Sequence, residues 1–255
     1  MSECKTLVKP NKMKILYRIY QVFVALPIVL VATLLTSIVV VIGCGIGMGG
    51  IFGYYPGKWW ARIIIWVLLI PVKVEGRENL VKGQSYVFVS NHQGAFDIFL
   101  IYGYLNRHFK WMMKKGIRKI PFVGAACAAA QHIFVDRTSA GKVRATYRKA
   151  REILQGGISL VVFPEGARTF TGQMAPFKRG AYMLADELQL PVCPMTINGS
   201  FKILPRTKDW HLNDWHPMTL TIHKPIEPIG TGPDNVRHAM EQSEAAILSA
   251  LDVES

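Results

Sequence analysis

A stretch of 39 residues without charge constrains this chain more than any other feature of its sequence. No Asp, Glu, Lys or Arg occurs between Arg18 and Lys58, and the stretch includes the apolar run from Val22 to Ile42. The hydrocarbon core of a bilayer is about 30 Å thick, and roughly 20 apolar residues cross it as a helix. A cleaved signal peptide would have a shorter apolar region and a cleavage site soon after it. We therefore expect residues 1–72 to form a helical membrane anchor; the alternative is a helix buried in a protein core.

A second apolar run, from Ile63 to Val72, indicates how the chain leaves the membrane. It has ten residues, too few to cross a bilayer, and the preceding Trp59 and Trp60 favour the membrane interface. The first 18 residues carry five cations and one acid, so the positive-inside rule keeps that end in the cytoplasm. We expect a shallow re-entrant hairpin that turns at the glycine-rich stretch 43–53. An active site in the following domain would then face the cytoplasm, at the inner membrane of a bacterium; a single span with an external domain is the alternative.

The glycine-rich stretch also contains a formal match to the dinucleotide-binding pattern G-x-G-x-x-G, from Gly45 to Gly50. That pattern needs a strand before it, a helix after it and an acidic residue about 20 positions further on. The next acidic residue is Glu75, and the preceding apolar run is too long for a strand. We therefore reject a nucleotide site here. Gly43 and Gly47 are instead four residues apart, as are Gly45 and Gly49. Small residues four apart allow helices to approach closely, or the chain to bend.

The overall charge restricts the partners of the chain. Of all residues 50% are apolar, and 30 Lys and Arg against 17 Asp and Glu give a formal net charge of +13. A chain that is both apolar and basic fits an anionic lipid surface better than nucleic acid. No nucleic-acid recognition motif accompanies the charge. We expect membrane lipids, and no nucleic acid, among its partners.

The cysteines and histidines predict neither cross-links nor a metal centre. The four cysteines are scattered and form no CxxC pair, so we expect no disulfide framework and a reducing location for the folded part. We expect no metal site, because no ligand spacing links four of the histidines: His132, His211, His216 and His223.

After residue 72 short β-rich runs alternate with helical ones, so we place a domain over residues 73–255. The predicted strands are 86–90, 133–135, 159–163, 192–197 and 219–223. The predicted helices are 98–105, 142–154, 179–188 and 235–251. This alternation predicts an α/β fold with a mixed, largely parallel sheet flanked by helices.

Three polar signatures follow predicted strands: Ser90–Asp97, Val135–Arg137 and Phe163–Arg168. In open α/β sheets, ligand sites gather beyond the carboxyl ends of the strands. The sequence therefore predicts an active site at that edge of the sheet.

Within the first signature, His92 and Asp97 are five residues apart across a predicted turn that contains Gly94. If the turn folds back, the carboxylate can accept a hydrogen bond from one ring nitrogen, which fixes the tautomer and stabilises the imidazolium. A histidine held in this way is a general base for an alcohol or a water. The alternative is a helix-capping Asp beside a surface His. A second polar cluster, with Glu165 and Arg168 in one turn, favours the catalytic interpretation.

Four blocks of residues resemble, in the same order, the motifs of the glycerolipid acyltransferases. A single block is weakly specific, but four in order with matching spacing are strongly specific. The resemblance extends over residues 70–225 and is strongest to the members that acylate lysophosphatidic acid. The blocks are Asn91-His92-x-x-x-x-Asp97, Lys115–Gly124 with Ile133–Arg137 after it, Phe163–Arg168 and Leu190–Pro194.

The resemblance implies a membrane-bound enzyme of phospholipid biosynthesis. Such an enzyme transfers a fatty acyl group from acyl-CoA or acyl carrier protein to the free hydroxyl of lysophosphatidic acid, giving phosphatidic acid, and needs no further cofactor. His92 would take the proton from the acceptor hydroxyl, and Asp97 would orient His92, with no acyl-enzyme. The chain accordingly contains no G-x-S-x-G elbow to supply a serine nucleophile.

The resemblance also implies a substrate-binding set. Arg137 and Arg168 are candidates for the acceptor phosphate, since guanidinium binds phosphate in a fork. The alternative for each is a surface salt bridge. Glu165 would position the glycerol backbone or these cations, and Gly166 and Lys115 belong to the same set.

A basic run surrounds Lys115. Its five cations are interleaved with Trp and Met, and such a run could hold anionic head groups or an acidic carrier. The alternative is a solvated basic face. The cations are Lys110, Lys114, Lys115, Arg118 and Lys119.

Two departures from the family pattern leave the acceptor and the acyl chain open. Gly116-Ile117 replaces a usual acidic-Leu pair, and Ala167 replaces a usual Thr. The alternative acceptor is another lyso-lipid or glycerol 3-phosphate. A hydrolase or metal site built on His92 and Asp97 is disfavoured, because no other His, Cys or paired carboxylates lie nearby in the sequence.

Overall fold

The computed structural model describes residues 12–135, 140–154, 157–207 and 211–252. Its N-terminal part is one continuous helix of 34 residues, composed of α1 (Lys12–Tyr20), the π-helical η1 (Gln21–Ala25) and α2 (Leu26–Gly45). After a turn come the short α3 (Gly49–Phe52) and α4 (Tyr55–Val67). The chain therefore turns back within the glycine-rich stretch, where Gly43 packs against the Phe52 side chain with no room for a Cβ.

The rest of the described chain alternates strands and helices. In order these are β1 (Val72–Glu75), η2 (Arg77–Asn79), β2 (Val87–Ser90), α5 (Phe96–Tyr104), β3 (Phe109–Lys114), η3 (Lys115–Lys119), α6 (Val123–Ala129), β4 (Ile133–Val135), α7 (Ala140–Ile153), β5 (Ser159–Val162), α8 (Gly180–Leu188), β6 (Val192–Asn198), α9 (Ser200–Ile203), β7 (Met218–Ile222) and α10 (Pro233–Ser249).

The strands form one sheet in the order β1-β7-β6-β2-β5-β3-β4. All neighbours run parallel except β6 and β7. β2 lies at the centre, so polar residues that follow it fall at the middle of the carboxyl edge. The predicted α/β class with a mixed, largely parallel sheet is confirmed.

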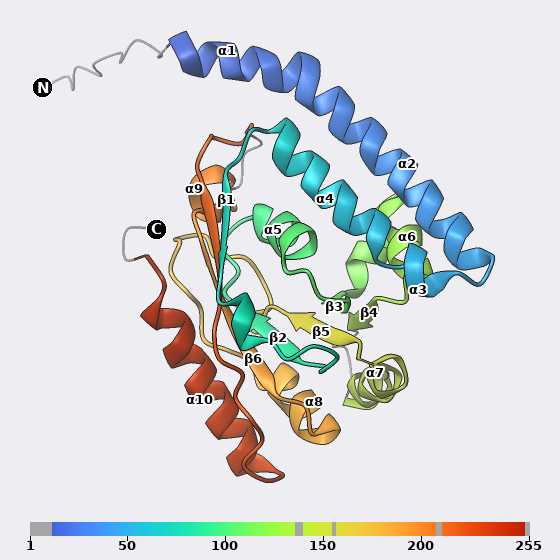
Figure 1. Ribbon diagram of the computed structural model, residues 1–255, viewed down its shortest axis with the longest axis vertical. Helices are drawn as coiled ribbons and strands as arrows, with labels where there is room; N and C mark the ends of the chain where they lie inside the picture. The colour runs from blue at the N-terminus through green and yellow to red at the C-terminus, as the bar shows by residue number, and fades with distance from the viewer. Residues whose placement is uncertain (1–11, 136–139, 155–156, 208–210, 253–255) are drawn as a thin grey trace, which may run out of the picture.

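Helices cover both faces of the sheet (Figure 1). On one face α7, α8 and α10 pack against an apolar layer that includes Val87, Val89 and Leu160. On the other face α4 and α5 cover Phe88, Phe109 and other large side chains. The α1–α2 helix lies outside α4 on this second face, as Figure 1 shows. The active-site edge is thus held between two packed layers.

The apolar core continues across residue 72, where we expected a domain boundary. Ile64 and Ile65 of α4 are buried, and together with Leu68 and Ile70 they join the core that contains Phe88. The run 63–72 is therefore not one membrane segment: it is the end of α4, a connection and the start of β1. We expected this run to face lipid, but α4 packs against α5 instead.

Candidate active site

The predicted polar signatures after β2 and β5 meet at the carboxyl edge of the sheet. The first residue after β2, Asn91, is fully buried and bridges to the neighbouring strand β6. Its Nδ2 donates a hydrogen bond to the carbonyl of Ile197, and the Ile197 N–H donates to its Oδ1, both at 2.8 Å. These two bonds fix the start of the turn that leads to α5.

His92 and Asp97 are in direct contact. Nδ1 of His92 lies 2.7 Å from Oδ2 of Asp97, and the same oxygen accepts the backbone N–H groups of Gln93 (2.8 Å) and Gly94 (3.0 Å). Asp97 is fully buried in the first turn of α5, where the helix dipole favours a negative charge. Nε2 of His92 has no hydrogen-bond partner among the described residues, so it is the ring nitrogen that remains for a substrate.

Ser200 completes the hydrogen bonding of Asp97. It is the first residue of α9, it is fully buried, and its hydroxyl donates to Oδ1 of Asp97. Gly94 packs against the same residue: a Cβ on Gly94 would lie 2.5 Å from the Ser200 carbonyl oxygen. The glycine in this turn is therefore required by the close approach of two backbones. Sequence analysis missed Ser200, since 103 residues separate it from Asp97; its only signal is its place just after β6.

The loop after β5 clamps the backbone of His92 from two sides. Oε1 of Glu165 accepts the His92 N–H at 2.6 Å, and the His92 carbonyl accepts the Thr169 N–H at 3.1 Å. Oε2 of Glu165 accepts the Ala175 N–H at 2.8 Å. Burial raises the pKa of Glu165 above its ordinary value, and these backbone donors and the nearby His92 oppose that shift. Glu165 therefore contacts backbone N–H groups rather than a cation.

An aromatic stack supports the imidazole of His92. Its ring lies flat on Phe163, with centroids 3.8 Å apart and an interplanar angle of 7°. Trp111 of β3 lies behind Phe163, at 5.7 Å and 24°. The stack covers one face of the imidazole, and together with the Asp97 contact it restricts the ring to one orientation.

The structure places Arg168 beside the clamp. Arg168 directly precedes Thr169, and its half-buried side chain has no hydrogen bond or ion pair within the described residues. The Arg168 carbonyl accepts a hydrogen bond from Arg206 at 3.2 Å, and the Arg206 guanidinium lies 4.1 Å from the ring centroid of Phe170. Sequence analysis missed Arg206, which follows α9 and adds a second cation to this loop.

The other expected substrate-binding residues are less closely placed. Gly166 lies in the loop after β5, next to Glu165. It has a positive φ of 80°, and its N–H donates to the Phe163 carbonyl. Lys115 is exposed at the start of η3, directly after β3. Arg137 lies outside the described residues.

The basic run does not form one continuous face. Lys110 is only 4% exposed, and its ammonium donates to the carbonyl of Ala130 at 2.7 Å. Burial lowers the pKa of Lys110. The expectation that all five cations face a ligand is wrong for Lys110, because the first half of β3 is buried on both faces of the sheet. Lys114, Arg118 and Lys119 are exposed.

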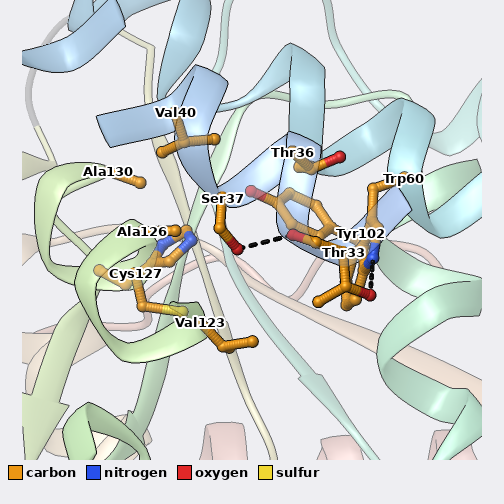
Figure 2. Close-up of a pocket in the computed structure, with 12 residues that line it drawn as sticks. Thr33, Thr36, Ser37, Val40, Trp60, Tyr102, Val123, Ala126, Cys127 and Ala130 are labelled. Atoms are coloured by element: carbon orange, nitrogen blue, oxygen red, sulfur yellow. Dashed lines mark hydrogen bonds between the residues drawn. The ribbon is translucent and has the colours of Figure 1, made fainter. Parts of the chain in front are cut away.

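A small cavity of about 60 Å³ lies between α2 and α6, on the face of the sheet that α4 and α5 cover. Figure 2 shows Thr33, Thr36 and Ser37 of α2 facing Val123 and Ala126 of α6 across it. Trp60 of α4 donates to the Thr33 hydroxyl at 2.9 Å and closes one side. The side chains around this cavity thus bring the N-terminal helix into contact with α4 and α6.

The geometry at the carboxyl edge supports acid–base chemistry on an alcohol or a water. Nε2 of His92 can accept a proton, and the buried, four-fold hydrogen-bonded Asp97 stabilises the imidazolium that forms. The arginines beside the clamp suit an anionic group on the molecule that loses the proton.

Comparisons with known proteins agree on one family. The family model described as Acyltransferase matches residues 71–198, which is half of the chain. The 1-acyl-sn-glycerol-3-phosphate acyltransferase LPAT1 of Arabidopsis thaliana is 34% identical over 176 residues, 69% of this chain and 49% of that protein. The corresponding Ovis aries alpha enzyme is 35% identical over 179 residues, 67% of this chain and 62% of that one. The chain thus spans about half the length of the first of these relatives.

A solved structure has the same fold over nearly its whole length. The 1-acyl-sn-glycerophosphate acyltransferase PlsC from Thermotoga maritima superposes with a TM-score of 0.73 at 26% identity, covering 93% of this chain and 97% of that one. The similarity therefore includes the N-terminal helices as well as the sheet. With the His92–Asp97 pair in place at the carboxyl edge, the chain belongs to the acyltransferase family that its four motifs resemble.

Proposed function

We propose that this protein transfers a fatty acyl group from an acyl thioester to the free hydroxyl of lysophosphatidic acid, giving phosphatidic acid. The observation that carries the proposal is the His92–Asp97 contact of 2.7 Å, with Nε2 of His92 left for a substrate. The names of the relatives in Arabidopsis thaliana, Ovis aries and Thermotoga maritima support this acceptor.

The reaction needs one base and no covalent enzyme intermediate. Nε2 of His92 accepts the proton of the acceptor hydroxyl while the oxygen attacks the thioester carbonyl. The tetrahedral intermediate collapses with cleavage of the C–S bond, and the departing thiolate takes the proton from the imidazolium. The products are an ester and a free thiol. Asp97 accepts the hydrogen bond from Nδ1 throughout and so keeps that nitrogen as the donor.

We assign the acceptor phosphate to Arg168, in the loop after β5, and to the cations near it. Arg168 is one residue from Thr169, whose N–H holds the His92 carbonyl, so a phosphate bound there lies close to the base. Arg206 fixes the Arg168 backbone, and Lys115 and Arg137 complete the proposed phosphate-binding set.

We infer the membrane placement from the packing of the N-terminal helix. It is the one helix among the described residues that is long and apolar enough to cross a membrane. Yet it is tied to the rest of the protein along its length: the Tyr17 hydroxyl donates to the Leu68 carbonyl at 2.8 Å, the Gln21 amide donates to the Asn213 carbonyl at 2.7 Å, and the middle of α2 shares a cavity with α6. A perpendicular crossing would break these contacts. We place the helix in the plane of the interface, on the cytoplasmic side, with its outer face in lipid.

The outer face of the helix is apolar enough for this arrangement. Its exposed large apolar side chains include Phe23, Leu30, Val31, Leu35 and Ile42. Reporter fusions after Ser2 and at Ser255 test the placement. Both should report the cytoplasm, and an external signal at Ser255 would contradict it.

A panel of substrates tests the reaction. Purified protein is incubated with labelled acyl-CoA or acyl carrier protein and with lysophosphatidic acid, glycerol 3-phosphate or lysophosphatidylcholine, and the products are identified. We expect labelled phosphatidic acid as the main product. A main product from glycerol 3-phosphate or lysophosphatidylcholine would reassign the acceptor.

A further inference from the structure

An exposed apolar pair stands at the end of the basic run. The side chains of Ile120 and Phe122 are 49% and 60% exposed, with the exposed Pro121 between them. Neighbouring large apolar side chains on a surface mark a site of contact with protein or membrane. None of the hydrogen bonds of the catalytic site involves this pair. Residues 118–122 are called the docking loop below.

The backbone of the docking loop is tightly held. The Ile120 N–H donates to the Ile117 carbonyl at 3.0 Å, and the Gly124 N–H donates to the Ile120 carbonyl at 2.8 Å. Gly124 packs directly against the Arg118 carbonyl, with no room for a Cβ. Phe122 has φ 60° and ψ −55°, a conformation that bulky residues rarely adopt. The loop therefore presents its apolar pair from a fixed turn.

The charge around the docking loop has one sign. Lys114, Arg118 and Lys119 are exposed beside the apolar pair. The sequence has no acidic residue between Asp97 and Asp136. A bilayer with anionic lipids attracts such a cluster, and apolar side chains beside it can enter the interfacial region.

The docking loop also lies near α2, the helix that faces lipid in the proposed placement. α6 begins at Val123, directly after Phe122, and Val123 lines the same cavity as Thr33 and Thr36 of α2 (Figure 2). The exposed side chains of the adjoining part of α2 include Leu30 and Val31. The loop thus ends close to the middle of α2.

We propose that the docking loop is a second membrane contact, which inserts Ile120 and Phe122 among the lipids of an anionic bilayer. The inference rests on the membrane placement under the proposed function. An anionic bilayer uses the cations for its head groups and takes up the apolar pair in its interfacial region, so we assign the bilayer as the partner of the loop. With α1–α2 it gives two lines of contact, which fix the tilt of the carboxyl edge toward the lipid surface.

A fluorescent probe tests the insertion directly. The full chain carries Cys4→Ser and Phe122→Cys, and the new cysteine is labelled with an environment-sensitive dye. The chain with Cys4→Ser alone, treated with the same dye, serves as the blank. Leu248→Cys on α10 is the matched control, because Leu248 is 50% exposed and α10 covers the opposite face of the sheet. Vesicles of phosphatidylcholine and phosphatidylglycerol should shift the emission at 122 to shorter wavelength and leave that at 248 unchanged. Equal emission changes at the two positions, or none, would overturn the proposal.

Substitutions test the contribution of the loop to binding. Ile120→Ser with Phe122→Ser should lower partition onto these vesicles by about tenfold, since two apolar side chains no longer enter the interface. Lys119→Glu should weaken partition onto the anionic vesicles more than onto phosphatidylcholine alone. Lys110→Met is the matched control for charge, because this buried lysine of the same run should not affect partition. Unchanged partition in the double variant would overturn the proposal.

Activity in detergent separates this inference from the proposed function. The double variant should keep wild-type turnover on lysophosphatidic acid dispersed in detergent micelles. Loss of turnover with acyl carrier protein, together with unchanged vesicle partition, would make the loop a carrier-binding site instead. The dye emission reports insertion even if the protein acylates none of the acceptors offered, so the two proposals fail separately.

Discussion

The hydroxyl of Ser200 donates a hydrogen bond to Oδ1 of Asp97, from 103 residues further along the chain. Asp97 meets the catalytic candidate His92 with its other oxygen, so Ser200 acts on the base only through the carboxylate. The contact joins the start of α9, just beyond β6, to the turn beyond β2. It makes Ser200 a positioning residue for the proposed base.

Ser200→Ala should lower kcat about tenfold, because a hydrogen bond to a buried charged group is worth roughly 1.5–3 kcal/mol. KM for both substrates should change little, since Ser200 contacts neither in the proposed scheme. Ser200→Thr keeps the hydroxyl and should restore most of kcat. Steady-state kinetics of the two variants checks the assignment; equal losses in both would indicate a packing role instead.

Glu165→Gln should lower kcat by about tenfold or more while the protein stays folded. The carboxylate accepts two backbone N–H groups, from His92 and Ala175, and an amide offers only one acceptor oxygen and turns a donor toward the other N–H. Circular dichroism checks the fold alongside the kinetics. Wild-type turnover in Glu165→Gln would show that the clamp does not position His92.

The raised pKa of Glu165 also predicts a pH dependence of stability. The folded chain binds this proton more tightly than the unfolded chain does, because burial disfavours the charged form. The Glu165 contribution is therefore fully present below pH 4.5, its ordinary pKa, and is lost as the pH rises through the raised pKa. The unfolding free energy of wild type minus that of Glu165→Gln should fall with rising pH across this window. A flat or rising difference in denaturant titrations would contradict the assignment.

Arg168→Ala should raise KM for lysophosphatidic acid about tenfold or more, and change KM for the thioester little. Arg168→Lys should recover only part of the affinity, because an ammonium cannot bind phosphate in a fork. Arg206→Ala should have a smaller effect of the same kind, since Arg206 holds the Arg168 carbonyl. A rise confined to the thioester KM would move Arg168 to the donor site.

Lys110→Met should raise the unfolding free energy by about 1 kcal/mol. The ammonium is buried and donates to the Ala130 carbonyl, and an apolar side chain of similar length removes the cost of burying a charge. Thermal unfolding in detergent measures the effect. A clear loss of stability would mean that the hydrogen bond outweighs the burial cost.

The α/β part of the fold could be predicted because its strands and helices carry strong local patterns. β2 and β5 are short, fully buried apolar runs, and α7 and α10 have charged, amphipathic sequences. β3 could not be predicted, because its cations indicate a surface run, although Lys110 is buried. β1 begins at Val72, the last residue of an apolar run that continues from α4, and no local pattern distinguishes lipid from a protein core on the outside of a helix.

The site could be predicted only where its contacts are local in sequence. His92 and Asp97 are five residues apart, so a single turn brings them together. Ser200 and Arg206 reach the site through the sheet order, which places β6 beside β2 and which no short spacing reveals. The contacts of Glu165 could not be predicted for the same reason: its partners are backbone N–H groups whose positions only the fold determines.

The central claim, that His92 is the general base for acyl transfer, is tested most directly by the turnover of His92→Ala. Wild type and variant are compared with labelled acyl thioester and lysophosphatidic acid, at equal amounts of folded, membrane-associated protein. We predict labelled phosphatidic acid from the wild type and a loss of at least about a hundredfold in the variant, as expected when a general base is removed. Turnover of His92→Ala within a few-fold of the wild type would contradict the account.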